Sequence, residues 1–103
     1  MTRGRPIAFQ RVADAAARQS RAILSRWLPG GREDAGEWIA RNPKRPDKKP
    51  GSFKINIKTC RWGDFATGDK GGDLISLAAY LFDLNQAAAA RRVAEMLGVD
   101  PYE

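Results

Sequence analysis

Apolar residues recur at helical spacing through residues 7–28, and no proline or glycine interrupts the run. We therefore expect one N-terminal helix over this range. The sequence Pro29-Gly30-Gly31 ends it, because proline cannot continue a helix and glycine favours a turn. The opposite face of this helix carries arginines that could contact phosphates, but arginines at this spacing more commonly form a solvated helix face. Its residues are Arg11, Arg18, Arg21 and Arg26.

Three short stretches in the middle of the chain are expected to be strands. Residues 37–41 are mixed, with Trp38 and Ile39 as apolar anchors. Residues 52–57 alternate strictly between apolar and polar side chains, which is the period of a strand with one buried face. Residues 61–65 are aromatic and follow after a very short connection, so these last two stretches predict a β-hairpin.

The register of this hairpin decides which side chains share a face. With a two-residue loop, Ile55 lies opposite Trp62. The same register places Lys54, Asn56 and Arg61 together on one face and the apolar side chains on the other. The loop lacks the Asn-Gly sequence that best fixes a turn of this length.

Loops rich in proline or glycine separate the remaining elements. Residues 42–51 contain three prolines and a run of basic residues, which predicts an extended, solvated loop. After the glycine-rich residues 66–72, Asp73 stands at the N-cap of a helix. Asn85 caps a last helix, which Gly98 ends. The pattern predicts an α+β fold: a small antiparallel three-stranded sheet with an N-terminal helix and two C-terminal helices.

Composition narrows the possible classes of protein. The 103 residues suffice for one compact domain, and 43% apolar with 29% charged residues is typical of a globular chain. There is no histidine and one cysteine, Cys60, which excludes an internal disulfide, a Cys/His zinc site and histidine base catalysis. We interpret Cys60 as incidental and expect no cofactor. The chain lacks a signal peptide and an apolar run near the ~18–20 residues of a membrane span, so we expect a cytoplasmic protein with no membrane partner.

The net charge of +6 is unevenly distributed along the chain. Residues 1–32 carry +6 and residues 41–61 carry +7, whereas residues 33–40 carry −3 and residues 62–103 carry −4. Such segregation indicates a surface that faces a polyanion, with simple solubilisation as the alternative. Cationic side chains displace counterions from phosphates, and an exposed aromatic ring stacks a base for roughly 1–3 kcal/mol. The residues predicted to bind nucleic acid are Lys44, Arg45, Lys48, Lys49, Lys54, Lys58, Arg61 and Trp62.

Several candidate features have a plainer explanation. Trp62 and Phe65 fall on opposite faces of one strand, and Trp62 is more often buried than stacking in this setting. The glycine-rich loop before Asp73 lacks the Gly-Lys-Ser/Thr of a phosphate-binding loop, and its aspartates repel phosphate. Asp64, Asp69 and Asp73 are conceivable magnesium ligands, but solvated turn and cap carboxylates are the usual outcome.

Three motifs within residues 36–98 carry a family resemblance. They are Ser52-Phe53, Arg61-Trp62-Gly63-Asp64-Phe65 and Gly71-Gly72-Asp73-Leu74-Ile75-Ser76-Leu77, the last being the most specific. This stretch resembles the N-terminal zinc-ribbon domain of DNA primases, and it looks closest to the primase-associated domains of phages, plasmids and integrated elements. The resemblance implies a zinc-ribbon-like domain over residues 36–98, preceded by a helix and turn in 1–35. Residues 99–103 are then a tail or the start of a linker.

The zinc ligands of that family are missing here. In the family a Cys and a His precede the Ser-Phe pair, and two Cys follow the aromatic strand. The corresponding positions fall near Pro43, Pro46, Phe65 and Gly68. The resemblance therefore implies a metal-free version of the domain, with prolines that stiffen the loop by lowering the entropy of its unfolded state.

Two functions from different classes follow. The resemblance implies a module of a primase or primase-helicase that engages single-stranded DNA and is not an enzyme by itself, because the catalytic domain with its acidic cluster is absent from these residues. A replication helicase is then a possible partner. The alternative is a stand-alone phage or mobile-element protein that docks on a host replication or defence complex, which the helix at 7–28, outside the resemblance, favours.

Overall fold

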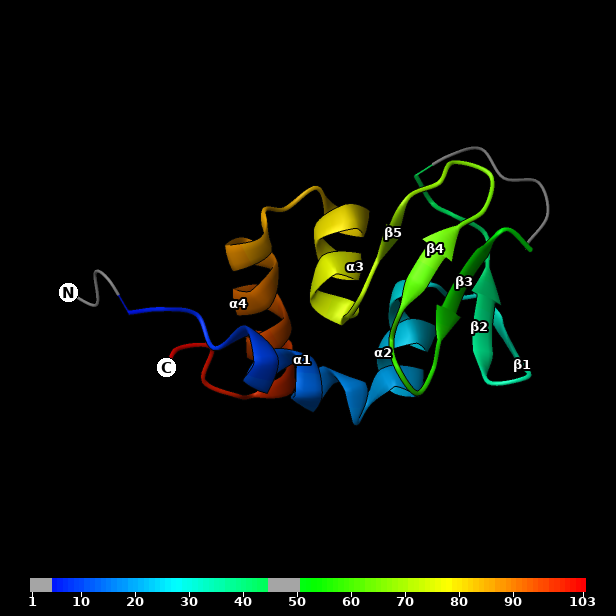
Figure 1. Ribbon diagram of the computed structural model, residues 1–103. Helices are drawn as coiled ribbons and strands as arrows, with labels where there is room; N and C mark the ends of the chain where they lie inside the picture. The colour runs from blue at the N-terminus through cyan, green and yellow to red at the C-terminus, as the bar shows by residue number, and fades with distance from the viewer. Residues whose placement is uncertain (1–4, 45–50) are drawn as a thin grey trace.

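The computed structural model describes residues 5–44 and 51–103, and it confirms the α+β class (Figure 1). The elements follow in the order α1 (Phe9–Ala17), α2 (Ser20–Trp27), β1 (Arg32–Asp34), β2 (Glu37–Ala40), β3 (Phe53–Asn56), β4 (Trp62–Asp64), β5 (Lys70–Gly71), α3 (Leu74–Phe82) and α4 (Gln86–Leu97). Among the described residues, no helix has the length and apolar character needed to cross a membrane.

The sheet has five strands, so the prediction of three was too low. The strands lie in the order β1-β2-β3-β4-β5, and each pairs antiparallel with the next. Strand β1 is charged and fully exposed, so no alternation marks it in the sequence. It forms because Ala35 and Gly36 both have positive φ, 52° and 81°, as a two-residue hairpin turn requires. Strand β5 is only two residues long and lies inside the glycine-rich stretch.

The register of the β3–β4 hairpin is as predicted, but its turn is different. Ile55 pairs with Trp62. The expected two-residue loop is wrong, because Cys60 N–H donates to the carbonyl of Asn56 at 2.8 Å and Cys60 has a φ of 66°. Residues 57–60 therefore form the loop. The side chain of Asn56 holds this loop by accepting hydrogen bonds from two of its backbone N–H groups, at 2.8 and 2.9 Å.

The N-terminal helix is interrupted, where one helix over 7–28 was predicted. The chain leaves α1 at Arg18, and Gln19 has a φ of −124°, outside the helical region. The buried hydroxyl of Ser20 then donates to the carbonyl of Ile57 at 2.7 Å. This break turns α2 toward the sheet, so Val12 of α1 and Leu24 of α2 enter one core.

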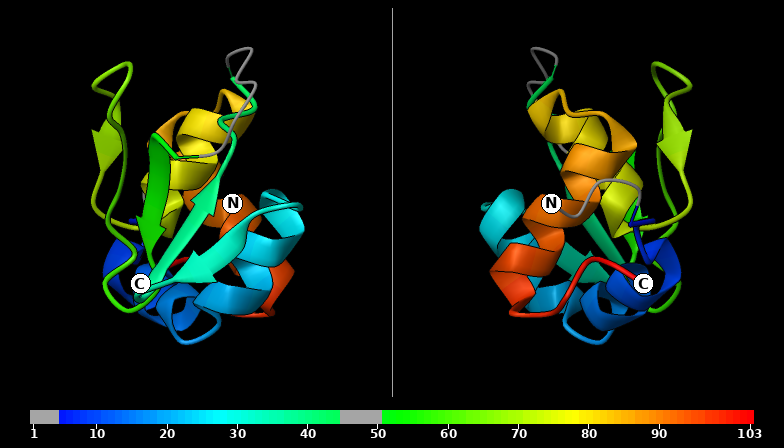
Figure 2. Two further views of the ribbon diagram at one scale, coloured as in Figure 1. Left: turned by 90° about the vertical axis from the view of Figure 1, so that its right-hand side faces the viewer. Right: turned by 90° about the vertical axis from the view of Figure 1, so that its left-hand side faces the viewer.

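The helices cover one face of the sheet and leave the other face open (Figure 2). Phe53, Ile55 and Trp62 point into the core, where they meet the apolar face of α3. The indole of Trp62 lies over Gly71 and donates to the hydroxyl of Ser76 at 3.0 Å. A side chain at Gly71 would collide with that indole, which explains a glycine in β5.

The predicted helix caps are present. Asp73 accepts from the N–H of Ser76 at 2.8 Å in a capping box, and Asn85 accepts from the N–H of Ala88 at 2.7 Å. Gly98 ends α4 with a φ of 72°. Each cap satisfies backbone groups that the helix itself leaves unpaired, which is why these positions can be recognised from sequence.

Residues 99–103, expected to be a tail or the start of a linker, pack against the start of the described chain. The N–H of Ala8 donates to the carbonyl of Pro101 at 2.7 Å, and the N–H of Glu103 donates to the carbonyl of Pro6 at 3.0 Å. Arg11 of α1 donates to the carbonyl of Tyr102 at 2.6 Å. Helix α1 also contacts α3 and α4, so the N-terminal segment shares its core with the rest of the chain.

Candidate nucleic-acid interface

A groove on the open face of the sheet is centred on Gly63 of β4. Gly63 pairs with Lys54 of β3 on one side and with Lys70 of β5 on the other. Arg61 and Phe65 immediately flank β4, two residues before and after Gly63, so their side chains share its face. The groove, of about 880 Å³, therefore has a floor without a side chain, surrounded by three cations and one aromatic ring.

Phe65 is the aromatic ring of this groove. Its side chain is 81% exposed, and the ammonium of Lys54 lies 5.7 Å from the centre of its ring. Its backbone is fixed, because its N–H donates to the carbonyl of Ser52 at 2.9 Å. The two aromatic residues Trp62 and Phe65 therefore differ in exposure: Trp62 is 6% exposed and lies in the core, whereas Phe65 faces the solvent.

Two of the three acidic residues that line the groove accept hydrogen bonds from other side chains of the protein. Asp64 is buried, and one of its oxygens accepts from the side-chain amide of Asn42 at 2.8 Å. Asp69 accepts from the hydroxyl of Tyr80 at 2.9 Å. Glu37 lies at the edge of the lining, on β2. Asp64 and Asp69 therefore each accept a hydrogen bond from a neutral donor within the protein.

The cations of the groove, by contrast, have no acidic partner among the described residues. Neither Lys54, Arg61 nor Lys70 forms an ion pair with any residue in the described ranges. Other cations on the surface are paired, as Arg21 is with Glu33 at 2.9 Å. The hydrogen bond from Arg21 lowers the pKa of Glu33. Unpaired cations around an exposed ring are what a phosphate backbone with stacked bases requires.

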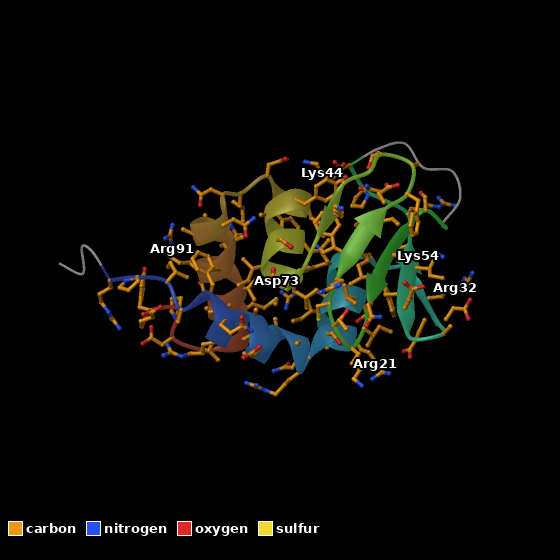
Figure 3. The ribbon with its side chains drawn as sticks, in the orientation of Figure 1. Arg21, Arg32, Lys44, Lys54, Asp73 and Arg91 are labelled. Atoms are coloured by element: carbon orange, nitrogen blue, oxygen red, sulfur yellow. The ribbon has the colours of Figure 1, made fainter. Side chains whose placement is uncertain are left out.

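The structure separates the residues predicted to form the site. Lys54 and Arg61 line the groove, whereas Lys44 lies apart from Lys54, near α3 (Figure 3). Lys44 forms an ion pair with Asp83, and its ammonium lies 5.7 Å from the ring centre of Tyr80.

The other predicted residues do not present their side chains to this groove within the described part of the chain. Lys58 is exposed on the β3–β4 loop and lines a different groove, beside Arg18. Trp62 borders the groove but has its side chain in the core. Arg45, Lys48 and Lys49 lie outside the described residues. Phe65 and Lys70 are absent from the set predicted from sequence. The alternation of side chains around β4 does indicate Phe65, because it places this ring on the face of the sheet that Trp62 does not occupy.

A buried polar network joins the two loops where the family resemblance locates its metal ligands. Asn42 precedes Pro43, and Asp64 precedes Phe65. The amide of Asn42 donates both to Asp64 and to the hydroxyl of Tyr80, each at 2.8 Å. Asp64 also accepts from the N–H of Ala66 at 2.8 Å, within the β4–β5 loop. Hydrogen bonds thus connect the end of β2, the β4–β5 loop and α3, and they fix the backbone beside Phe65.

Neither metal binding nor thiol chemistry has support from the described residues. Within the ranges 5–44 and 51–103, no three or more His, Cys, Asp or Glu side chains are grouped so as to hold a metal ion. Cys60 is buried, and its burial raises the pKa of its thiol, with a smaller contribution from the charge of Asp73. A buried thiol with a raised pKa is a poor nucleophile.

The fold is similar to part of a solved primase structure. No family model matches the sequence, and no curated protein matches it. The crystal structure of the Aquifex aeolicus primase (zinc binding and RNA polymerase domains) aligns with a TM-score of 0.70 and 22% sequence identity. The alignment covers 86% of this chain and 22% of that chain, so this chain spans about a fifth of its length. At this level of identity the likeness shows a primase-like fold, in agreement with the resemblance drawn from the motifs.

Proposed function

We propose that this chain is a nucleic-acid-binding module related to DNA primases, and that it holds single-stranded DNA in the groove around Gly63. The observation that carries the proposal is the combination of exposed Phe65 with Lys54, Arg61 and Lys70, three cations without an acidic partner in the described part of the chain. The primase-like fold agrees with this role. We also propose that the part of the solved primase to which this chain corresponds is its zinc-binding domain.

Single-stranded DNA suits the groove better than a duplex does. Phe65 presents its ring beside a glycine floor, and a base can lie on that ring only if it is free of its paired strand. A duplex would offer only phosphates to the cations. The three lysine and arginine side chains determine how strongly the binding constant K depends on salt. Contact with three phosphates of a single strand corresponds to a slope of log K against log salt concentration of about −2.

We propose binding without catalysis for this chain. It contains no histidine, and its one cysteine is buried with a raised pKa. An origin in a phage, plasmid or integrated element, and a replication helicase as partner, belong to the same proposal and rest on the sequence resemblance.

Fluorescence anisotropy with a labelled oligothymidylate tests the proposal. We expect tighter binding of the single strand than of a duplex of the same length, with the salt slope of about −2 given by three phosphate contacts. The double substitution Lys54→Glu/Arg61→Glu should abolish the salt-dependent part, while Arg21→Glu, which removes a paired arginine on α2, should change affinity far less. Equal binding of duplex and single strand, or equal losses in the two variants, would contradict the proposal.

A further inference from the structure

A second groove lies between α2, α3 and α4, and it has a different character from the groove on the sheet. Its lining includes the aromatic rings of Trp27 and Phe82, the side chain of Met96, and the charged residues Arg26, Arg92 and Glu95. Its volume is about 660 Å³, enough for one or two side chains of a partner. It shares no lining residue with the groove around Gly63.

The apolar part of this groove is exposed although it stands next to the core. Phe82, at the end of α3, is 47% exposed. Its ring meets that of Trp27, at the end of α2, edge to face with 5.6 Å between centroids. Met96 of α4 lies in the same lining, and the flexible thioether of methionine adapts to differently shaped partners. An exposed aromatic ring beside a methionine is typical of a surface that receives an apolar side chain.

Two cations border these rings without an acidic partner. Arg26 and Arg92 are exposed, and neither has an ion pair or side-chain hydrogen bond with any described residue. Glu95 belongs to the same lining but is not within ion-pair distance of either arginine. The cations near this groove are therefore available to an acidic ligand from outside the chain, because partners bind with a positive patch on one facing a negative patch on the other.

From these observations we infer a docking site for a short acidic segment of another protein. One apolar side chain of that segment rests on Phe82 and Met96, and its carboxylates pair with Arg26 and Arg92. A nucleic acid fits less well, because the rings of Trp27 and Phe82 already meet edge to face and Met96 adds apolar surface that offers nothing to a phosphate. An amphipathic segment in an apolar groove between helices is a common mode of peptide recognition. This inference does not depend on the proposed nucleic-acid site.

The test uses the full chain and a labelled acidic peptide. This peptide has Leu and Phe at positions i and i+4, and Asp and Glu at the positions between and around them. We expect the wild type to bind this peptide, and Arg26→Glu/Arg92→Glu to weaken binding at least ~10-fold, equivalent to about 1.4 kcal/mol. Lys54→Glu/Arg61→Glu makes the same change in net charge at the other groove and serves as the matched control. It should weaken oligothymidylate binding but leave peptide binding nearly unchanged.

Nuclear magnetic resonance locates the peptide independently of the variants. The indole N–H resonance of Trp27 should shift on peptide addition, while those of Trp38 and Trp62 should not, because neither lines the groove. Circular dichroism confirms that each variant is folded. The inference is overturned if the wild type does not bind the peptide, or if the two double variants lose equal affinity for the peptide. It is also overturned if oligothymidylate shifts the indole resonance of Trp27 and displaces the peptide.

Discussion

Substitution of Asn42 by alanine should destabilise the fold severely, although Asn42 lies outside the helices and strands. Its amide donates to Asp64 and to Tyr80, and its oxygen accepts from the N–H of Lys44, each at 2.8 Å. The hydrogen bond to a buried carboxylate contributes about 2 kcal/mol and each of the other two about 1 kcal/mol. Entry of water recovers part of this, so we expect a loss of about 3 kcal/mol in the free energy of unfolding.

Such a loss is large against the ~5–15 kcal/mol that stabilises a typical domain. At roughly 4–8 °C per kcal/mol, it lowers the melting temperature by about 12–24 °C. Urea denaturation measures it, with tryptophan fluorescence and far-ultraviolet circular dichroism as two probes of one transition.

The matched control is Asn85→Ala, which makes the same chemical change at the N-cap of α4. Asn85 is exposed and accepts one hydrogen bond from the N–H of Ala88, so its loss should cost about 1 kcal/mol. If Asn42→Ala costs no more than Asn85→Ala, the buried network does not connect β2, the β4–β5 loop and α3 as we describe.

Three further predictions concern the groove on the sheet and the buried thiol. Phe65→Ala should weaken oligothymidylate binding by about 1–3 kcal/mol while urea denaturation shows nearly unchanged stability, because this ring is exposed and stacks a base in the mode of binding that we propose. Lys54→Ala should weaken binding more than Lys44→Ala in the same anisotropy assay, because Lys44 is already paired with Asp83. Cys60 should react with a thiol reagent only as fast as the chain unfolds. Because the pKa of its thiol is higher in the folded state than in the unfolded chain, its contribution to stability is complete at neutral pH and falls as the pH rises past 9.0. Urea denaturation at several pH values checks this dependence.

The elements that could be predicted from sequence are those with a strong local signal. The alternation of residues 52–57 gives β3 and the pairing of Ile55 with Trp62, because one face of this strand is buried. The caps at Asp73 and Asn85 follow from the side-chain oxygen that each helix start needs. In each case the deciding interaction lies within a few residues of the signal.

The parts that could not be predicted depend on contacts between distant residues. Beside the break between α1 and α2, Ser20 donates a hydrogen bond to Ile57, 37 residues away. Strand β1 has only exposed, charged side chains and is recruited by pairing with β2. Lys44 looks like a phosphate ligand in the sequence, but the fold brings Asp83 to it from the end of α3.

The same limit applies to the candidate site. Sequence alone identifies Lys54 and Arg61 as neighbours, because they belong to one hairpin. Lys70 joins them only through β5, a strand too short to be recognised from its two residues. The exposure of Phe65 follows once Trp62 is known to be buried, since successive residues of a strand face opposite sides and these two residues are three positions apart.

The substitution Gly63→Leu tests the central claim most directly. A Cβ at Gly63 would lie 3.6 Å from the carbonyl oxygen of Asp69 and 3.7 Å from the Cβ of Lys70, which are ordinary contacts, so the fold should be retained. The leucine side chain would occupy the floor of the groove. Gly72→Leu is the matched control, because Gly72 is exposed, has open space around it and lies outside the lining.

We predict that Gly63→Leu lowers the affinity for oligothymidylate at least ~10-fold, about 1.4 kcal/mol, with an unchanged circular dichroism spectrum. Gly72→Leu should bind like the wild type. Wild-type affinity in folded Gly63→Leu would show that single-stranded DNA, if bound, does not lie in this groove.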